Sequence, residues 1–532
     1  MWNLYQKISS VLEEILKKEN VYSNISPPFW EIPSQDKFGD LALTIALKLS
    51  SFLKQNPQTI AQKIVEKLKE KLNKEIEKIE IVPPGFINIF FSSFTLKEFL
   101  HSLLSEDKNI FLHIFPERKI LLEFVSANPT GPLSIAHGRQ AVIGDVLANF
   151  FEFLGNKVIR EYYVNDVGRQ ISLLIHSVEE RIKELKGEEF KIPEDGYHGE
   201  YVIDLAKEAL KKKPKDLEKF VISSILKGIE KDLKKIGVVF KSWVSQKGLI
   251  EKKEVEKVIN LLKEKNLVYK KEGALWFSST KFGDDKDRVL KKSDEEFTYF
   301  ACDIAYHKNK AERGFDKLIN LWGPDHHGYI KRVKSAFSAL GFDESILNIV
   351  IVQLVSLKTK ERMSKRKGKI FLLSDLVEEV GREAARFYYL TRRNSSLLEF
   401  DIKKAKEISF DNPLYYIQYA HARICSIFKK AKRKRIHLKY IDFLNEEKEI
   451  FLLRKLFRFY FCLEKIYYFL EPVFLVEYLK ELATTFHKFY EEERVIMQNK
   501  DKMYARLLLL KGVKKILSWG LNILGIKPKE RM

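Results

Sequence analysis

The loop between an apolar run at 120–125 and His137 has the residue types that suit phosphate binding. It contains Pro129, Gly131 and Pro132, and His137 then opens a helical pattern. A strand, a glycine- and proline-rich turn and a helix start present backbone N–H groups and the positive end of a helix dipole to an anion. His137 can donate a further hydrogen bond to such a group. The loop is therefore a candidate phosphate site.

A basic stretch much later in the chain can act on the same phosphates. Residues 362–366 read Arg-Met-Ser-Lys-Arg. Lys365 is able to neutralise negative charge on phosphate groups, as cationic side chains do in phosphoryl transfer. A solvated basic loop is the simpler interpretation of so short a pattern. The stretch follows an apolar strand pattern, however, and ligands bind beyond the carboxyl ends of parallel strands, which favours the functional interpretation.

The elements that must position these two loops form an α/β pattern that is interrupted once. Its first half is predicted to contain a strand at 120–125, a helix at 137–154 that stops at Gly155, and a strand at 157–164. Charged helical patterns and a hairpin, 267–269 with 274–277, occupy residues 170–295, which we interpret as an insertion. Its second half is predicted to contain a strand at 317–322, a helix from about 328 to 340, and a strand at 346–357.

The segments on either side have different patterns. Residues 1–115 begin with amphipathic helices and reach a strand at 87–91, and the chain after about residue 370 is almost entirely helical. The predicted domains are 1–115, 116–370 with its insertion at about 170–295, connecting helices at 371–410, and a helical domain at 411–532. The densest positive patch is 429–435, which is either a solvated helix end or an RNA contact.

Composition bounds the partners and the compartment. The 532 residues carry 94 Lys and Arg against 73 Asp and Glu, a formal charge of +21. A protein this basic usually meets a polyanion, although a lysine-rich proteome would give the same excess. The three cysteines, Cys302, Cys425 and Cys462, form no Cys-x-x-Cys pair, which disfavours a disulfide framework or a zinc ribbon. With no signal-peptide pattern and no membrane-span pattern, we expect a cytoplasmic protein.

Several nucleotide-binding classes lose support because their motifs are absent. The sequence contains neither a Gly-x-x-x-x-Gly-Lys phosphate loop nor a Gly-x-Gly-x-x-Gly dinucleotide turn. Composition and spacing alone therefore indicate an α/β nucleotide-binding protein with a basic helical appendage.

Taken together, the two loops resemble the signature motifs of a class I aminoacyl-tRNA synthetase, and their details are similar to arginyl-tRNA synthetase. Three stretches carry that likeness in the middle of the chain: 128–133 (Asn-Pro-Thr-Gly-Pro-Leu), 297–308 (Phe-Thr-Tyr-Phe-Ala-Cys-Asp-Ile-Ala-Tyr-His-Lys) and 322–329 (Trp-Gly-Pro-Asp-His-His-Gly-Tyr). Four more extend it across nearly the full chain: 37–42, 84–88, 416–423 and 526–532. The implied fold is multidomain α/β plus all-α: a class I Rossmann-like catalytic domain with a parallel sheet split by an insertion, an N-terminal α+β domain and a C-terminal helical bundle.

The resemblance also assigns residues to roles. The implied catalytic residues are Ser134, His137 and Lys365. The implied ATP-binding residues are Pro129, Thr130, Gly131, His137, Gly138, Gly323, Asp325, His327, Met363, Ser364 and Lys365. The implied arginine-binding residues are Glu123, Ser126, Asn128, Tyr299, Asp303 and His326. The implied tRNA-binding residues are Phe38 and Asn88 in a domain that binds the tRNA elbow, and Tyr416, Tyr419 and Met532 in an anticodon-binding domain.

Physical chemistry supports parts of this assignment and leaves alternatives open. Fixed carboxylates such as Asp303 accept the planar fork of a guanidinium bidentately, but Glu123 could instead form a structural ion pair. Asp325 can accept ribose hydroxyls, whereas the neighbouring pair His326 and His327 could suggest a metal, which we do not expect. Aromatic rings such as Tyr419 suit stacking with unpaired bases, and core packing would explain them equally well.

The family's usual His-x-Gly-His is replaced here by Ser134-Ile135-Ala136-His137, and Arg362 stands at the first position of the second motif, where Lys is usual. Ser134 keeps a hydroxyl donor, and Arg362 keeps the charge. The resemblance implies ATP with Mg²⁺ as substrate complex, L-arginine and tRNA(Arg) as partners, no structural metal, no membrane, a monomer, and activation that needs tRNA. The remaining alternatives are a synthetase for another amino acid and an RNA-binding module without turnover.

Overall fold

A computed structural model describes the chain except for residues 1, 20–28, 34, 113, 359–370 and 433–434. The described residues form two compact units. The first unit comprises Met1–Pro116, Phe153–Gly155 and Glu407–Met532, and the second comprises Glu117–Glu152 and Asn156–Lys406. Among the described residues, no helix is both long and apolar enough to cross a membrane.

The second unit is built on a parallel sheet. Its strands in the described chain have the order β12-β11-β5-β6-β7, and all neighbours are parallel. Their bounds are β5 Lys119–Glu123, β6 Lys157–Val164, β7 Ser242–Ser245, β11 Lys317–Trp322 and β12 Leu347–Ile351. The helix α5 (Ile135–Phe153) packs closely on this sheet, because a Cβ on Gly144 would lie 2.2 Å from the ring of Phe124. Only glycine permits that approach.

The predicted strands at 157–164 and 317–322 are confirmed as β6 and β11. The strand predicted at 120–125 ends two residues early, at Glu123, because Val125 and Ser126 have φ of 69° and 39° and turn the chain out of the sheet. The segment predicted as an insertion is not wholly separate, since β7 is the edge strand of the same parallel sheet.

The single strand predicted at 346–357 is wrong. It is two strands, β12 and β13 (Val355–Leu357), and β13 pairs with β14 (Leu398–Phe400) in a sheet of its own. The break occurs where the Gln353 N–H bonds to the Asn394 carbonyl and the Gln353 carbonyl accepts from Arg139, both at 2.9 Å. β14 is a short strand in the part of the chain after residue 370 that we expected to be almost entirely helical.

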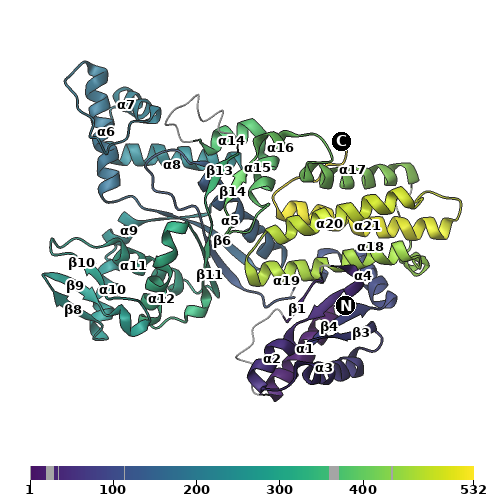
Figure 1. Ribbon diagram of the computed structural model, residues 1–532. Coiled ribbons are helices and arrows are strands. Elements are labelled where there is room, and N and C mark those ends of the chain that lie inside the picture. The colour runs from purple at the N-terminus through teal and green to yellow at the C-terminus, as the bar shows by residue number, and fades with distance from the viewer. Residues whose placement is uncertain (1, 20–28, 34, 113, 359–370, 433–434) are drawn as a thin grey trace. The chain divides into compact units, whose positions relative to one another are not determined.

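Helices and a small antiparallel sheet complete the second unit (Figure 1). The predicted hairpin is present as β8 (Val268–Lys271) and β9 (Ala274–Phe277), and β10 (Arg288–Lys291) adds a third strand. The remaining α-helices described here are α6 Arg169–Lys186, α7 Glu200–Lys212, α8 Leu217–Lys235, α9 Gln246–Glu251, α10 Glu254–Glu264, α11 Tyr299–Glu312, α12 Ile330–Ala339, α14 Leu373–Val380, α15 Arg382–Tyr389 and α16 Ile402–Lys406.

The first unit joins an N-terminal α+β part to the C-terminal helices. The N-terminal part has an antiparallel sheet of order β1-β2-β4-β3 in the described residues. Its elements are α1 Trp2–Lys18, β1 Trp30–Glu31, β2 Leu41–Leu43, α2 Ile45–Leu53, α3 Pro57–Leu72, β3 Ile76–Val82, β4 Phe86–Phe91 and α4 Ser93–Ser105. The C-terminal helices are α17 Pro413–Ala431, α18 Glu447–Phe457, α19 Phe459–Phe469, α20 Val473–Glu492 and α21 Lys500–Ile523.

These two parts, which we expected as separate domains, share a core within the first unit. The ring of Phe91 lies 4.9 Å from that of Phe457, and Trp30 donates a hydrogen bond to the Glu464 carboxylate. Arg454 on α18 forms an ion pair with the buried Asp40 at 3.3 Å. Buried aromatic contacts of this kind contribute beyond the area they cover, so the N-terminal sheet and the C-terminal helices stabilise one another.

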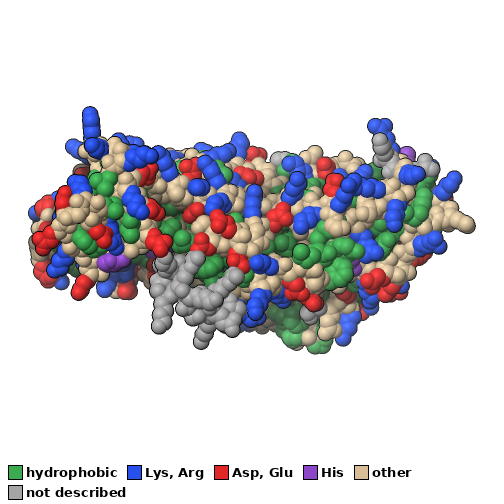
Figure 2. Space-filling model, turned by 90° about the horizontal axis from the view of Figure 1, so that it is seen from above, with side chains coloured by type: hydrophobic (Ala, Val, Ile, Leu, Met, Phe, Trp, Pro, Cys, Tyr) green, Lys and Arg blue, Asp and Glu red, His purple; other side chains and the backbone are tan. Residues whose placement is uncertain are grey.

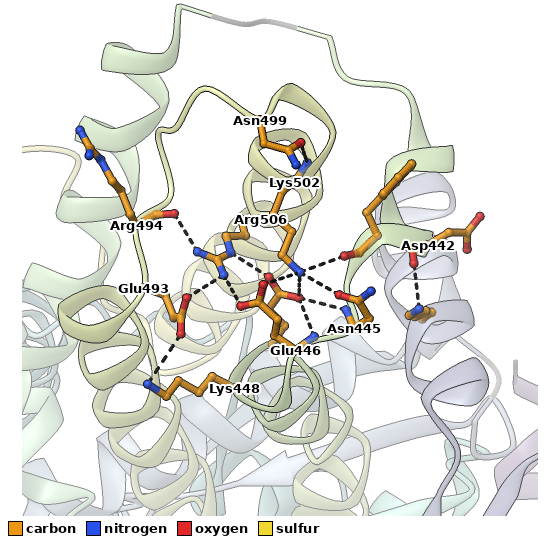
Figure 3. Close-up of polar contacts among 12 residues, drawn as sticks. Asp442, Asn445, Glu446, Lys448, Glu493, Arg494, Asn499, Lys502 and Arg506 are labelled. Carbon is orange, nitrogen blue, oxygen red and sulfur yellow. Dashed lines mark hydrogen bonds and ion pairs between the residues drawn. The ribbon is translucent and has the colours of Figure 1, made fainter.

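A network of charges around the buried Arg506 closes one end of the C-terminal helices (Figure 3). Arg506 on α21 donates to Glu449 at 2.7 Å, to Glu446 at 2.5 Å and to Glu493 at 2.6 Å. Lys502, one turn earlier, donates to Glu449 at 2.7 Å. Arg506 is only 3% exposed. Its contacts link the start of α18, the end of α20 and the start of α21.

Candidate active site

A cavity of about 670 Å³ lies at the carboxyl edge of the parallel sheet in the second unit. Its walls come from the ends of β5, β6 and β11, from α11 and from the 3₁₀ helix η5 (Pro324–Tyr329). The structure brings together in this cavity all six residues predicted to bind arginine: Glu123, Ser126, Asn128, Tyr299, Asp303 and His326. Three predicted ATP-binding residues also line it: His137, Gly323 and Asp325.

A second cavity of about 930 Å³ adjoins the first and shares Ala127, Asn128, His137 and Gln170 with it. Thr130, Gly131 and Ser134 line this cavity, as do Tyr197 and His198 from the segment before α7 and Tyr201 from its first turn. Of the described residues predicted to bind ATP, Pro129, Gly138 and His327 line neither cavity. Gly138 serves packing instead, because a Cβ there would lie 2.5 Å from Leu373.

The second basic motif cannot be placed, since Arg362, Met363, Ser364 and Lys365 lie outside the described residues. The residues that flank it are fixed within the second unit. On one side, the Lys358 N–H bonds to the Phe400 carbonyl at 3.1 Å. On the other side, Leu372 forms an antiparallel bridge with Ser134. The chain therefore leaves the described region beside β14 and re-enters it directly against the loop that carries His137.

The contacts of His137 define its protonation. The backbone N–H of Ser134 donates to His137 Nδ1 at 3.1 Å, and the Ser134 hydroxyl lies 3.1 Å from the same atom. An atom that accepts from an N–H carries no proton, so the proton of the neutral ring is on Nε2. Burial lowers the pKa of His137, which favours this neutral form. His137 thus offers a single N–H donor, and the contacts with Ser134 fix the orientation of its ring.

The backbone after β5 is strained where it meets the cavity. Val125 is β-branched and has φ of 69°, a region that such residues rarely adopt. The turn places the Ser126 hydroxyl between two partners: it donates to Glu123 at 2.9 Å and accepts from the Tyr163 N–H at 3.1 Å. Strain of this kind persists where surrounding structure holds it, often at functional sites.

Glu123 forms the ion pair that the sequence left open as an alternative. Its carboxylate pairs with Lys310 at 2.5 Å, and both side chains are buried, at 5% and 0% exposure. Glu123 nevertheless lines the cavity. A carboxylate has more acceptor positions than the contacts with Lys310 and Ser126 use, so the ion pair does not prevent a contact with a ligand.

Asp303 is the second acid of the cavity and stands in the second turn of α11. Thr298 caps this helix by accepting from the Ala301 N–H at 3.2 Å, and the Tyr329 hydroxyl donates to Asp303 at 2.6 Å. Burial raises the pKa of Asp303 to about 6, with Glu123 adding to the shift and Tyr329 opposing it. The carboxyl is therefore poised to ionise fully when a cation binds.

The ribose candidates, Gly323 and Asp325, lie together at the start of η5. A Cβ on Gly323 would lie 2.5 Å from an oxygen of Asp325, so glycine lets that carboxylate fold back over the turn. His326 Nδ1 lies 3.1 Å from the other oxygen of Asp325. No group of three or more His, Cys, Asp or Glu side chains in the described part of the chain could hold a metal ion.

Several polar and aromatic residues of the cavity were not predicted: Gln140, Tyr163, Asn165, Gln170, Gln246, Tyr306, His307, Trp322 and Tyr329. A usable signal existed for some of them. Asp303, Tyr306, His307 and Lys310 follow the spacing i, i+3, i+4 and i+7, which places them on one face of a helix. A polar face at this spacing, buried on α11, indicates contact with polar groups of the sheet.

The predicted tRNA contacts all belong to the first unit. Phe38 and Met532 are exposed, whereas Asn88 is buried in β4, between β2 and β3. Tyr416 and Tyr419 pack against His487, with ring centroids 4.5 and 5.7 Å apart. Their half-buried rings serve packing and still reach the surface.

Phe410 packs against Tyr419 at 5.0 Å and is 58% exposed. Lys and Arg side chains are spread over the face in view in Figure 2, with Asp and Glu among them. An exposed aromatic group on a basic protein is suited to unpaired bases.

This combination of a split parallel sheet, a His137 loop at its carboxyl edge and a helical C-terminal part defines a class I aminoacyl-tRNA synthetase. A family model described as the catalytic domain of class I tRNA synthetases (R) matches residues 99–408. Models for the arginyl-tRNA synthetase N-terminal domain and the DALR anticodon binding domain match residues 3–91 and 417–532. The chain belongs to the arginyl-tRNA synthetase family.

Relatives agree over the full length. The arginine–tRNA ligase of Aquifex aeolicus is 42% identical, over 98% of this chain and 99% of that protein. The arginine–tRNA ligase of Thermotoga maritima is 40% identical, over 99% of each. A solved structure of a putative arginyl-tRNA synthetase from Campylobacter jejuni is 35% identical, with a TM-score of 0.74 over 83% of this chain and 100% of that chain.

Proposed function

We propose that the chain activates L-arginine with ATP to give arginyl-adenylate and pyrophosphate, and then transfers arginine to the 3′-terminal adenosine of tRNA(Arg). One observation carries the proposal: a single cavity places the carboxylates of Glu123 and Asp303 beside the phosphate-binding loop of His137. Acids that select a guanidinium and a donor that binds phosphate thereby share one site.

Arginine is held with its guanidinium at Asp303, whose carboxylate accepts two parallel N–H groups. Tyr299 stands at the rim of the cavity with 54% of its surface exposed, and it covers the ligand once bound. Asn128, held by Gln170 at 2.6 Å, and His326 orient the α-carboxylate and α-ammonium groups. The arginine carboxylate then faces the α-phosphate of ATP near His137.

ATP binds as its magnesium complex along the loop that carries Thr130 and Gly131. The Nε2–H of His137 donates to phosphate, and Gly323 with Asp325 holds the ribose. Lys365 neutralises the negative charge that develops on the leaving pyrophosphate. Because the attacking carboxylate needs no activation, these groups act by positioning reactants and by stabilising charge.

The second cavity receives the 3′ end of tRNA. It is continuous with the arginine cavity through Asn128 and His137. Tyr197 and His198 line its side and can stack on an unpaired base. The first unit binds the body of the tRNA, with residues 1–115 at the elbow and 411–532 at the anticodon, where Tyr416, Tyr419 and Met532 contact bases. The protein acts as a monomer and needs tRNA for activation.

ATP–pyrophosphate exchange with arginine, with and without tRNA(Arg), tests this function. Exchange that depends on both arginine and tRNA is the expected result, and tRNA binding without any exchange would make the chain an RNA-binding protein instead. Lys365→Ala is expected to lower turnover far more than arginine affinity. Equal losses in both would contradict its role at the transition state.

A further inference from the structure

A row of polar side chains crosses the middle of the parallel sheet beneath α11. Asn320 on β11, Glu123 on β5 and Glu161 on β6 are directly paired across neighbouring strands. All three are buried, with exposures of 0%, 5% and 0%. Residues in direct register point to the same face of a sheet, so this face carries two carboxyl groups and an amide where apolar packing on a helix is usual.

The polar face of α11 supplies the partners of this row. Lys310 donates to Glu123 at 2.5 Å and to Asn320 at 3.0 Å, and its ammonium lies 4.0 Å from the centre of the Tyr306 ring. Arg313 and Tyr306 both donate to Glu161 instead, Arg313 at 2.6 and 2.8 Å and Tyr306 at 2.9 Å. Lys310 is therefore the cation that pairs with Glu123, the carboxylate of this row that lines the cavity.

The direction of each hydrogen bond around Lys310 follows from the protonation of His307. Burial lowers the pKa of His307 to about 3, so the ring is neutral. Its Nδ1 donates to the Asp303 carbonyl at 2.7 Å, and its Nε2 must then accept from the Asn320 amide at 2.8 Å. The Asn320 oxygen consequently faces Lys310. The four hydrogen bonds that join Asp303, His307, Asn320, Lys310 and Glu123 therefore have compatible directions.

We propose that Lys310 is a positioning residue for arginine recognition. Its ammonium holds the Glu123 carboxylate in place and neutralises its charge, so that Asp303 alone balances the positive charge of the bound guanidinium. The inference rests on the proposed function. Two uncompensated carboxylates facing one guanidinium would leave an unpaired buried charge, which is costly. With Lys310 in place, the acids and cations of the occupied cavity balance.

The surroundings of Asp303 agree with this electrostatic role. The charged and titratable groups that face its carboxyl come from β5, β6, α11 and η5: Glu123, Tyr163, Cys302, Lys310, His326 and Tyr329. Burial raises the pKa of Asp303 most, Glu123 raises it further, and Lys310 lowers it. Removing Lys310 is therefore expected to raise that pKa above about 6 and to favour the protonated acid.

The test is Lys310→Met, which keeps an unbranched stem without the charge. The matched control is Lys308→Met on the same helix, because Lys308 pairs with Glu312 at 2.6 Å and, among the described residues, lines neither cavity. Steady-state charging of tRNA(Arg) is measured with arginine, ATP and tRNA each varied in turn. For Lys310→Met, kcat/KM for arginine should fall by about 30-fold while KM for ATP stays within about twofold.

A pH profile separates positioning from a structural role. In Lys310→Met, the acid limb of kcat/KM for arginine should move to higher pH by about one unit, and in Lys308→Met it should not move. An unchanged KM for arginine, equal rises in KM for arginine and for ATP, or an unmoved acid limb would each overturn the proposal. Wild-type protein that charges no arginine would instead refute the proposed function.

A second variant covers the case in which Lys310→Met does not fold. Asn320→Leu keeps the ion pair of Lys310 with Glu123 and removes the amide, which accepts from the ammonium and donates to His307 Nε2. We expect KM for arginine to rise by about fivefold, with KM for ATP unchanged and thermal unfolding still cooperative. No change in KM for arginine in a folded Asn320→Leu protein would overturn the proposal.

Discussion

Asp303 makes arginine use dependent on pH in a way that can be worked out in advance. Its carboxyl accepts a guanidinium only when ionised, and burial raises its pKa to about 6. A carboxyl with a raised pKa loses its charge at higher pH than an ordinary aspartic acid. Arginine use is therefore expected to be complete above pH 7 and to decline as the pH falls through 6.

The size of the decline follows from the titration of one group. With a pKa of about 6, about nine-tenths of the Asp303 carboxyl is ionised at pH 7 and about one-tenth at pH 5. Because kcat/KM reports the ionisation of the free protein, kcat/KM for arginine should fall about tenfold between these two values. An aspartic acid of ordinary pKa would give a fall of less than about 10%.

The assay is initial-rate charging of tRNA(Arg) from pH 5 to 8 at constant ionic strength, with ATP and tRNA saturating. In kcat, the acid limb should lie at lower pH than in kcat/KM, since the bound guanidinium stabilises the ionised form. An acid limb near pH 4, or the same midpoint in both parameters, would refute the reasoning. A limb that appears equally in kcat/KM for ATP would belong to His137 rather than to Asp303.

The other predictions concern the phosphate loop, the C-terminal helices and the RNA surface. His137→Asn should lower kcat by about 10²- to 10³-fold, whereas Ser134→Ala, which keeps the backbone N–H contact, should lower it less than about tenfold; single-turnover activation measures both, and equal losses would contradict the contacts described. Arg506→Met breaks a buried charge network and should cost about 3–5 kcal/mol, lowering the unfolding temperature by roughly 6–20 °C. Lys448→Met is the control: the ion pair of Lys448 is exposed, so its loss should change the unfolding temperature little. Tyr419→Ala should raise KM for tRNA about tenfold if the ring stacks on a base; a lower unfolding temperature with unchanged KM would show that it only packs.

Much of the fold is predictable from the sequence where local signals are strong. The strands at 157–164 and 317–322 are uninterrupted β patterns, and the latter has turn residues directly after it, so their bounds match β6 and β11. The split of 346–357 has no comparable local cause. This split depends on Asn394, which lies far away in sequence and whose carbonyl bonds to the Gln353 N–H. A pattern of apolar residues does not indicate such a partner.

The candidate site also combines residues that local signals predict with residues whose role depends on distant contacts. The resemblance to the family predicted six residues that gather in one cavity. They lie at the carboxyl end of a strand, in the loop after it, or in the first turns of a helix. Lys310 was missed because a lysine on a helix is usually solvated. Its role depends on the register that sets Asn320 beside Glu123, and that register exists only in the assembled sheet.

Charging of purified tRNA by the recombinant protein tests the central claim most directly. The substrate is radiolabelled arginine, with lysine and glutamine in parallel, and Asp303→Asn serves as the site variant. The account predicts charging with arginine alone and its loss in Asp303→Asn. Charging with another amino acid, unchanged arginine use in Asp303→Asn, or bound tRNA without any charging would contradict it.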